Sequence, residues 1–303
     1  MKIVHNGLRA LNIVPAMVLA AVLPIGSTIA APVMGGPEGN TPLPEVSTQE
    51  DINAMLPESI RESGAVTIVM TTSSPPAHYT TENGMRGLDH DLAAIIAQAM
   101  GLKPTIVGAP FDQVIPGLQA HRYDVVISQF KPSVARGKVL DFVNYAQSGT
   151  SLGVLRGNPE NLSVEALCGV RIGVQKGSSQ AIGTIPELSK ECTEAGKEPV
   201  DKKTFLDSTT TLLALRSKRV DGVLIDSPVM GYAAKQSDRF ELVDTIASNP
   251  VGIGVLKDSG LAKPIQKALQ YLRGSNAYQD VFDAWGMKVN MVPDFAINKL
   301  QEQ

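Results

Sequence analysis

The chain has 303 residues, of which 43% are hydrophobic and 19% are charged, and its formal net charge is −3. This length and apolar content are sufficient for two lobes of ordinary domain size. The slightly acidic balance, with no basic stripe along the chain, argues against a nucleic-acid partner. The four histidines and two cysteines form no cluster with metal-ligand spacing, so we expect neither a metal ion nor a cofactor.

The first 30 residues have the pattern of a secretory signal peptide. Lys2 and Arg9 precede an apolar stretch from about Leu11 to Ile29, which prolines interrupt and which ends among small residues. An uncleaved membrane anchor is the alternative, but the interruptions favour cleavage. Cleavage would change the formal charge from −3 to −5, and we expect the mature protein to be periplasmic.

Residues 31–55 are rich in proline, glycine and small polar residues, which is typical of a flexible linker. We therefore expect the folded part to begin at residue 56.

The chain contains two cysteines, Cys168 and Cys192. In an oxidising compartment an even count favours a disulfide, which would stabilise the fold by about 3 kcal/mol in the chain-entropy model. Two unpaired buried thiols are the alternative.

Short apolar runs alternate with helical patterns over the rest of the chain. The strand-like runs are 66–70, 104–108, 124–128, 151–155, 170–174, 222–226 and 251–256. Amphipathic helical patterns occupy 88–101, 112–121, 208–219, 227–236, 261–272 and 277–286. This alternation predicts an α/β fold whose largely parallel sheets are covered by helices on both faces.

Ligands of such sheets bind beyond the carboxyl ends of the strands. Phe111 follows the second apolar run, Arg136 the third and the turn 177–179 the fifth, while Asp226 ends the sixth. A guanidinium pairs with a carboxylate, turn amides add donors, a carboxylate accepts from an ammonium, and an aromatic ring covers an apolar stem. These groups predict a site for a zwitterion.

The chain carries, in order, SPPAHY, MRGLDHDLAAIIAQAMG, FDQVIPGLQAHRYDVVIS, VARGKVLDF, LCGVRIGVQKGSSQ, RVDGVLIDSPV, VGIGVLKDSGL and FDAWG. This series resembles the extracytoplasmic solute-binding proteins of polar amino-acid ABC transporters, the bacterial solute-binding protein family 3. The resemblance covers residues 60–287. It implies a two-lobe periplasmic-binding-protein fold of type II, with each lobe a mostly parallel sheet flanked by helices and joined to the other by a two-segment hinge.

The resemblance also implies lobe boundaries. Lobe 1 would comprise 56–151 and 250–303, and lobe 2 would be the insertion 152–249. The crossing segments would lie near 149–153 and 248–252.

Position by position, the resemblance implies that Arg136 binds the α-carboxylate and Asp226 the α-ammonium of an amino acid. Phe111 would stack on the side-chain stem, and Ser178 or Ser179 would donate to the carboxylate.

The chain departs from the family pattern at several ligand positions. Ala77 replaces an aromatic residue, so His78 or Tyr79 could substitute for it. Gln129 stands where small or hydroxyl residues usually contact the ligand. Thr71 stands where members that bind cations carry an acid.

Lys131 is a further departure, because a small or hydroxyl residue is usual there. Its stem could carry the ammonium to solvent at the cleft lip. Alternatively it could reach a second negative group of the ligand. With no acid in TTSSPPAHY, the second interpretation favours a polar or acidic amino acid.

Each predicted site residue also has an ordinary structural interpretation. Arg136 could cap a helix or pair with Asp141. Asp226 could be the N-cap of the next helix. Phe111 could belong to the core, and His78 could be a core residue with satisfied hydrogen bonds.

A periplasmic enzyme on the same fold, such as a dehydratase, is the alternative function. The chain has no GxSxG elbow, no histidine paired with a plausible nucleophile and no extra carboxylate in the predicted site. A receptor's sensing domain would need a membrane span after residue 287, where we predict none. We therefore expect a monomeric, non-enzymatic protein that delivers an amino acid to the permease of an ABC importer by hinge closure.

Overall fold

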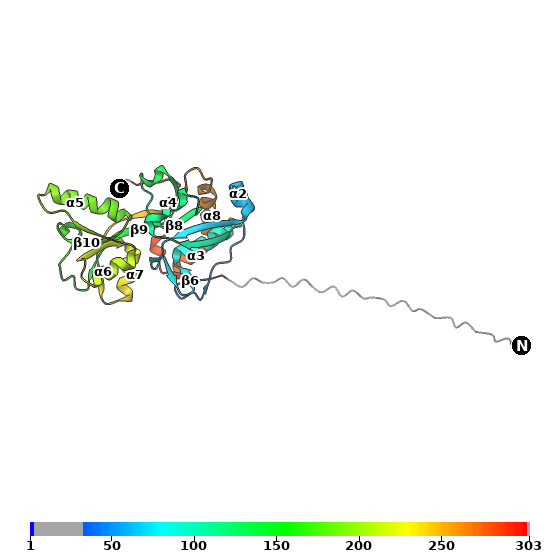
Figure 1. Ribbon diagram of the computed structural model, residues 1–303, viewed down its shortest axis with the longest axis horizontal. Coiled ribbons are helices and arrows are strands. Elements are labelled where there is room, and N and C mark those ends of the chain that lie inside the picture. The colour runs from blue at the N-terminus through cyan, green and yellow to red at the C-terminus, as the bar shows by residue number, and fades with distance from the viewer. Residues whose placement is uncertain (3–32, 302–303) are drawn as a thin grey trace. The chain divides into compact units, whose positions relative to one another are not determined.

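The computed structural model describes residues 1–2 and 33–301 (Figure 1). Apart from its first two residues, the predicted signal peptide lies outside the described residues. Within the part that is described, no helix has the length and apolar character needed to cross a membrane.

A mixed eight-stranded sheet is the centre of the fold, with the strand order β11-β10-β12-β9-β13-β8-β3-β7. β3 is parallel to β7 and β8, and β10 is parallel to β11 and β12. The antiparallel pair β9 and β13 joins these two groups. The strands are β3 (Ala65–Met70), β7 (Lys103–Gly108), β8 (Val125–Phe130), β9 (Leu140–Leu155), β10 (Arg171–Gln175), β11 (Asp201–Phe205), β12 (Gly222–Asp226) and β13 (Phe240–Leu256).

The long strands β9 and β13 each contribute to two sets of apolar cores. Val143 and Val251 lie in a core with residues of β3 and β8, whereas Leu152 and Val243 belong to a core with residues of β10 and β12. We call the part around β3, β7 and β8 the first lobe and the part around β10, β11 and β12 the second lobe. β9 passes between them (Figure 1).

Helices cover both faces of the sheet in each lobe, because successive side chains of a strand point to opposite faces. In the first lobe, Ile68 packs in the core of α3 (Leu88–Ala99) and α8 (Ala262–Gly274), and Val69 packs in the core of α4 (Val114–Gln119). In the second lobe, Leu224 faces the core of α5 (Ile185–Glu194), and Val223 faces α6 (Ser208–Arg216) and α7 (Ser227–Gln236). This arrangement confirms the predicted fold class.

Shorter elements complete the chain. A three-stranded sheet is formed by β4 (Ser73–Ser74), β5 (His78–Thr81) and β6 (Gly84–Arg86). α9 (Ala277–Ala284) packs against α8. Single turns of 3₁₀ helix are η1 (Phe111–Gln113), η2 (Arg136–Lys138), η3 (Val164–Ala166) and η5 (Lys288–Asn290), and η4 (Gln180–Thr184) is a π-helical turn.

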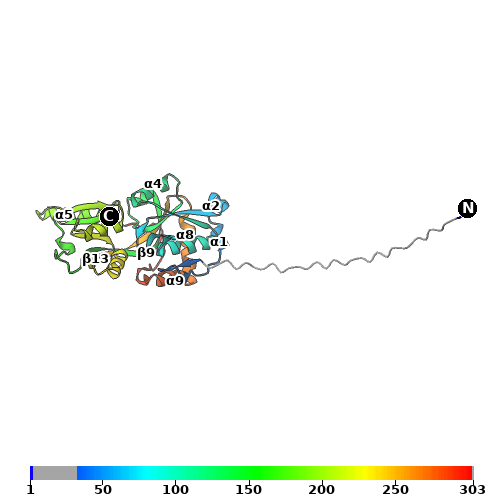
Figure 2. The same cartoon turned by 60° about the horizontal axis from the view of Figure 1, so that its bottom comes forward.

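Over residues 33–55, the structure differs from the flexible linker predicted for residues 31–55. Val46 and Ile52 are buried in the core of the first lobe, and the backbone N–H of Gly36 donates to Asp91 Oδ2 at 2.8 Å. Prolines and glycines shape the turns of this segment, but the two apolar residues anchor it. Its elements, together with the helix that follows, are β1 (Met34–Gly35), β2 (Thr41–Pro42), α1 (Glu50–Asn53) and α2 (Glu58–Ser63), and Figure 2 shows α1 beside α8.

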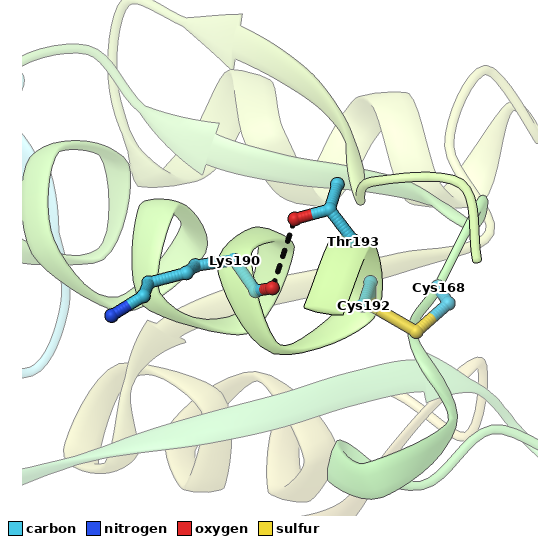
Figure 3. The surroundings of a disulfide bond; sticks show 4 residues. All are labelled: Cys168, Lys190, Cys192 and Thr193. Atoms are coloured by element: carbon cyan, nitrogen blue, oxygen red, sulfur yellow. Dashed lines mark hydrogen bonds between the residues drawn. A yellow bond between two sulfur atoms is a disulfide. The ribbon is translucent and has the colours of Figure 1, made fainter. Parts of the chain in front are cut away.

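The predicted disulfide between Cys168 and Cys192 is present, with the two Cα atoms 5.5 Å apart. It links the segment before β10 to the end of α5, where the Thr193 hydroxyl donates to the carbonyl of Lys190 (Figure 3). Both cysteines pack in the core of the second lobe. The alternative of two unpaired thiols is therefore wrong.

Candidate functional site

Arg136 lies where the two lobes meet. Its side chain leaves the turn after β8, is 7% exposed, and donates to the carbonyl of Lys131 at 3.0 Å and to that of Gly177 at 3.1 Å. Burial lowers the pKa of Arg136 to about 10, and the negative charge of Asp226 opposes this shift. The guanidinium of the first lobe thus reaches the Gly177 turn of the second lobe.

Neither structural alternative for Arg136 holds. Asp141 Oδ1 accepts instead from Asn298 Nδ2, and its Oδ2 accepts from the backbone N–H of Asp258. The carbonyls that Arg136 contacts belong to turns rather than to the end of a helix.

The C-terminal segment holds the turn that carries Lys131 and Arg136. Gln301 donates its N–H to the carbonyl of Pro132 at 2.8 Å and accepts from the N–H of Val134 at 3.1 Å. Its side-chain amide donates to the carbonyl of Pro250 in β13 at 3.0 Å. The turn is therefore tied both to the chain end and to β13.

Asp226 ends β12 and precedes α7, but its carboxylate makes no capping hydrogen bond to that helix. Oδ1 accepts from Gln180 Nε2 at 2.9 Å, and the same amide donates to Thr150 Oγ1 at 3.1 Å. Asp226 thus occupies the N-cap position of α7 without capping it through its side chain, and its carboxylate instead accepts from Gln180 at the junction of the lobes. Gln180 was not predicted as a site residue, although it directly follows the Gly-Ser-Ser turn.

The ammonium of Lys131 lies beside β9 rather than in solvent. Nζ donates to Thr150 Oγ1 at 3.0 Å. Burial lowers the pKa of Lys131, while the charge of Asp226 raises it and that of Arg136 lowers it further. The side chain is therefore directed toward Asp226 and β9, which contradicts the cleft-lip interpretation.

Phe111 packs against the core that contains Phe130 and also lines a cavity. Its ring stacks on Phe130 with centroids 4.4 Å apart, and the Arg136 guanidinium carbon lies 5.5 Å from the Phe111 centroid. A cavity of about 130 Å³ adjoins this ring. It is lined from both lobes by Thr71, Thr72, Gly108, Ala109, Pro110, Phe111, Gln175, Leu206 and Asp207.

Three predicted ligand residues join a buried polar network instead. His78 Nε2 lies 2.6 Å from Thr71 Oγ1, and its Nδ1 lies 2.7 Å from Asp89 Oδ2. Gln129 Nε2 donates to Asp89 Oδ1 at 3.1 Å. Of the three, only Thr71 lines the cavity. His78 is thus a core residue with satisfied hydrogen bonds, which is the ordinary structural interpretation.

Asp89 is the centre of that network, a role that its sequence pattern did not predict. It is fully buried, and its Oδ1 also accepts from the Tyr145 hydroxyl at 2.6 Å. Burial, the charge of Asp89 and this hydrogen bond raise the pKa of Tyr145 well above its ordinary value. Because Tyr145 lies 56 residues further along the chain, sequence pattern alone gave no signal for the pair.

The turn after β10 combines Gly177, Ser178 and Ser179. Gly177 has a φ of 76°, a conformation that glycine adopts at little cost. Ser178 Oγ accepts from the N–H of Ala181 at 3.2 Å, and Ser179 Oγ donates to Gln180 Oε1 at 3.4 Å. The Gly177 carbonyl is the group that meets Arg136, so the turn already contacts the first lobe.

Small polar contacts connect the two lobes at the margin of this site. Ser73 Oγ donates to Thr209 Oγ1 at 2.6 Å, and Asp112 pairs with Lys176 at 2.8 Å. Ion pairs and hydroxyl contacts of this kind contribute little when water can replace them.

The described residues contain no group of three or more His, Cys, Asp or Glu side chains that could hold a metal ion. The polar atoms that converge on the junction of the lobes are instead a guanidinium, an ammonium, a carboxylate and amides. Such groups bind small charged organic molecules through charge-assisted hydrogen bonds.

Comparison with known proteins gives one family and several similar amino-acid-binding proteins. Residues 66–288 match the family of bacterial extracellular solute-binding proteins, family 3. The arginine-binding protein ArgT of Corynebacterium glutamicum is 26% identical over 290 residues, which cover 93% of each chain. A solved structure of an ancestral arginine-binding protein bound to arginine is 32% identical, covers 73% of this chain and 98% of that one, and has a TM-score of 0.67.

A third relative is an ancestral amino acid-binding protein, AncCDT-1, described as a precursor of cyclohexadienyl dehydratase. Its structure is 26% identical, covers 75% of this chain and 98% of that one, and has a TM-score of 0.66.

Proposed function

We propose that this chain, which belongs to family 3 of the bacterial extracellular solute-binding proteins, binds a polar α-amino acid between its lobes and delivers it to the permease of an ABC importer. The observation that carries the proposal is the placement of Arg136 and Asp226 on opposite lobes at one junction. The guanidinium would pair with the α-carboxylate and the Asp226 carboxylate with the α-ammonium.

Binding would exchange protein contacts for ligand contacts. A carboxylate beside Arg136 would replace the Lys131 and Gly177 carbonyls, which are neutral acceptors. A carboxylate adds the attraction between opposite charges and can accept two N–H groups of the guanidinium side by side, which carbonyls from two separate turns do not. The Gly177 turn, with Ser178 and Ser179, would supply further donors from the second lobe, so the ligand would favour the closed state.

The proposed lobe boundaries follow from the apolar core that each part of β9 and β13 joins. We propose lobe 1 as 56–151 plus 250–303 and lobe 2 as 152–249. The change of core partners between Ala146 and Leu152 in β9, and between Ile246 and Val251 in β13, supports these boundaries. A register shift between Ile246 and Asn249 interrupts the ladder there, where a bend would be accommodated.

The ligand is polar in this proposal, and the acidic preference depends on Lys131. The contact of Lys131 with Thr150 and the influence of Asp226 on its pKa put its ammonium at the end of the site that would hold the α-ammonium. This supports Lys131 as a residue that shapes the pocket more than as an anchor for an acidic side chain.

A dehydratase-like enzyme is the second candidate, favoured by the likeness to AncCDT-1. Prolonged incubation of the protein with its bound amino acid, followed by mass spectrometry, separates the two. A binding protein returns the ligand unchanged, whereas an enzyme returns a product that has lost water.

We further propose that the protein is periplasmic and monomeric. Family membership and the signal-peptide pattern of residues 1–30 support the periplasmic location.

Titration calorimetry with the common amino acids tests the proposal. Wild type should bind at least one of them, and Arg136→Ala and Asp226→Ala should each lose about 2 to 5 kcal/mol of binding free energy, because each leaves a charge unpaired. Asp141→Ala is the matched control, since Asp141 is a first-lobe acid whose partners lie outside the site. Unchanged affinity in either site variant rejects the assignment.

A further inference from the structure

The cavity beside Phe111 has one acid in its wall. Asp207 comes from the second lobe, just before α6, and lines the cavity together with Thr71 of the first lobe. If Arg136 and Asp226 hold the two ends of an α-amino acid, the side chain must extend away from both. The cavity adjoins the Phe111 ring next to Arg136, so it is where that side chain would lie.

The two oxygens of Asp207 have different surroundings. Oδ1 accepts from the N–H of Thr210 at 2.7 Å and from its hydroxyl at 2.9 Å, which caps α6. Oδ2 has no hydrogen-bond or ion-pair partner among residues 33–301. Half of this carboxylate is therefore available to a ligand.

Gln175 provides a second polar group without a partner. Its Nε2 is buried and makes no hydrogen bond, although the residue lines the same cavity. Such groups are rare in folded proteins because leaving them unpaired costs free energy. Rotation of the amide by half a turn would present its oxygen, so Gln175 can serve as an acceptor as well as a donor.

We infer that Asp207 determines the specificity of this site and selects a ligand with a cationic side chain, a guanidinium above all. The inference depends on the proposed amino-acid binding. A guanidinium presents several N–H groups in one plane, so it can donate to Asp207 Oδ2 and to a rotated Gln175 while its face covers the Phe111 ring. Asp207 would supply the negative charge that family members binding cations carry at the position of Thr71.

The other charges near the junction do not cancel this acid. Asp112 and Lys176 pair with each other at 2.8 Å. Lys131 donates to Thr150 and does not line the cavity. Arg136, whose guanidinium carbon lies 5.5 Å from the Phe111 centroid, would be neutralised by the ligand's own α-carboxylate. Asp207 is thus the unpaired charge that an entering side chain meets in the cavity wall, and because it belongs to the second lobe, its contact with the ligand also stabilises closure.

The test compares L-arginine with L-citrulline, which has nearly the same shape but an uncharged urea group. Wild type should bind arginine at least about tenfold more tightly than citrulline, since a charge-assisted pair is lost with citrulline. Asp207→Asn should remove most of this difference while leaving citrulline affinity within about threefold. Asparagine is as good an N-cap as aspartate, so α6 should keep its start.

Asp112→Asn is the matched control, because it removes a nearby acid that is already paired. It should leave the ratio of arginine to citrulline affinity unchanged. Asp207→Ser, which also retains a capping oxygen, is measured if Asp207→Asn fails to fold.

The possible results distinguish failure of this inference from failure of the proposed function. Equal binding of arginine and citrulline by wild type, or an arginine preference that persists in the Asp207 variants, overturns the inference. Tighter binding of glutamate or of an uncharged amino acid overturns it as well but leaves the proposed function standing. Absence of binding by every common amino acid rejects both.

Discussion

Replacement of Asp89 by alanine should destabilise the first lobe by about 3 to 5 kcal/mol, as expected when a buried charged partner is removed from its network. The Tyr145 hydroxyl, the Gln129 amide and the His78 ring each lose their contact with the carboxylate, at 2.6, 3.1 and 2.7 Å respectively. A buried polar group left unpaired costs about 1 to 3 kcal/mol, and partial rearrangement keeps the total below a simple sum. The loss is large beside a total stability of about 5 to 15 kcal/mol.

Urea unfolding followed by fluorescence measures this loss. Trp285 is the only tryptophan of the chain and lies in the core of the first lobe, so its emission reports that lobe. Asp89→Asn is the informative companion, because it keeps one acceptor oxygen for Tyr145 and Gln129 and should lose less. A destabilisation by Asp89→Ala below about 1 kcal/mol would refute the reasoning, since it would mean that water or rearrangement satisfies all three groups.

Three further predictions concern charge, covalent linkage and the chain end. Lys131→Met should stabilise the ligand-free protein by about 1 kcal/mol at pH 7, because burial disfavours the ammonium. The pKa of Lys131 in the folded protein lies below the ordinary 10.5, so this destabilisation is complete below the folded pKa and vanishes as the pH rises toward 10.5. The difference in unfolding free energy between wild type and Lys131→Met, measured in urea, should therefore shrink as the pH rises, and a constant difference would contradict this. Cys168→Ser combined with Cys192→Ser should lower the unfolding free energy by about 3 kcal/mol, and an unchanged midpoint in thermal unfolding would show that the linkage is dispensable. Deletion of residues 300–303 should speed hydrogen exchange of amides 133–138 and weaken ligand binding, because Gln301 no longer holds that turn. Exchange as slow as in wild type would show that the Gln301 hydrogen bonds do not stabilise the turn.

The periodic parts of the fold were predictable from sequence. The helical pattern at 227–236 coincides with α7, and the apolar runs at 66–70 and 222–226 coincide with β3 and β12 to within one residue. These elements bury the side chains that their pattern marks as apolar. β11 was missed because DKKTF is a largely exposed edge strand, whose charged residues read as a surface segment.

The candidate site was predictable only where a residue's role follows from its place in a strand-end motif. Arg136, Asp226 and Phe111 were found in this way, and the structure brings them to the junction of the lobes. Asp89 and Asp207 lie at the starts of α3 and α6, and neither was predicted to belong to the site. Their further roles depend on residues distant in sequence, which only the tertiary fold brings near.

Small-angle X-ray scattering of the protein with and without its amino acid is the most direct test of the central claim, that the ligand is held between two lobes and closes them. The amino acid that binds most tightly in calorimetry should reduce the radius of gyration, and Arg136→Ala should show no such change at the same ligand concentration. An unchanged radius of gyration for wild type saturated with that amino acid would contradict the account.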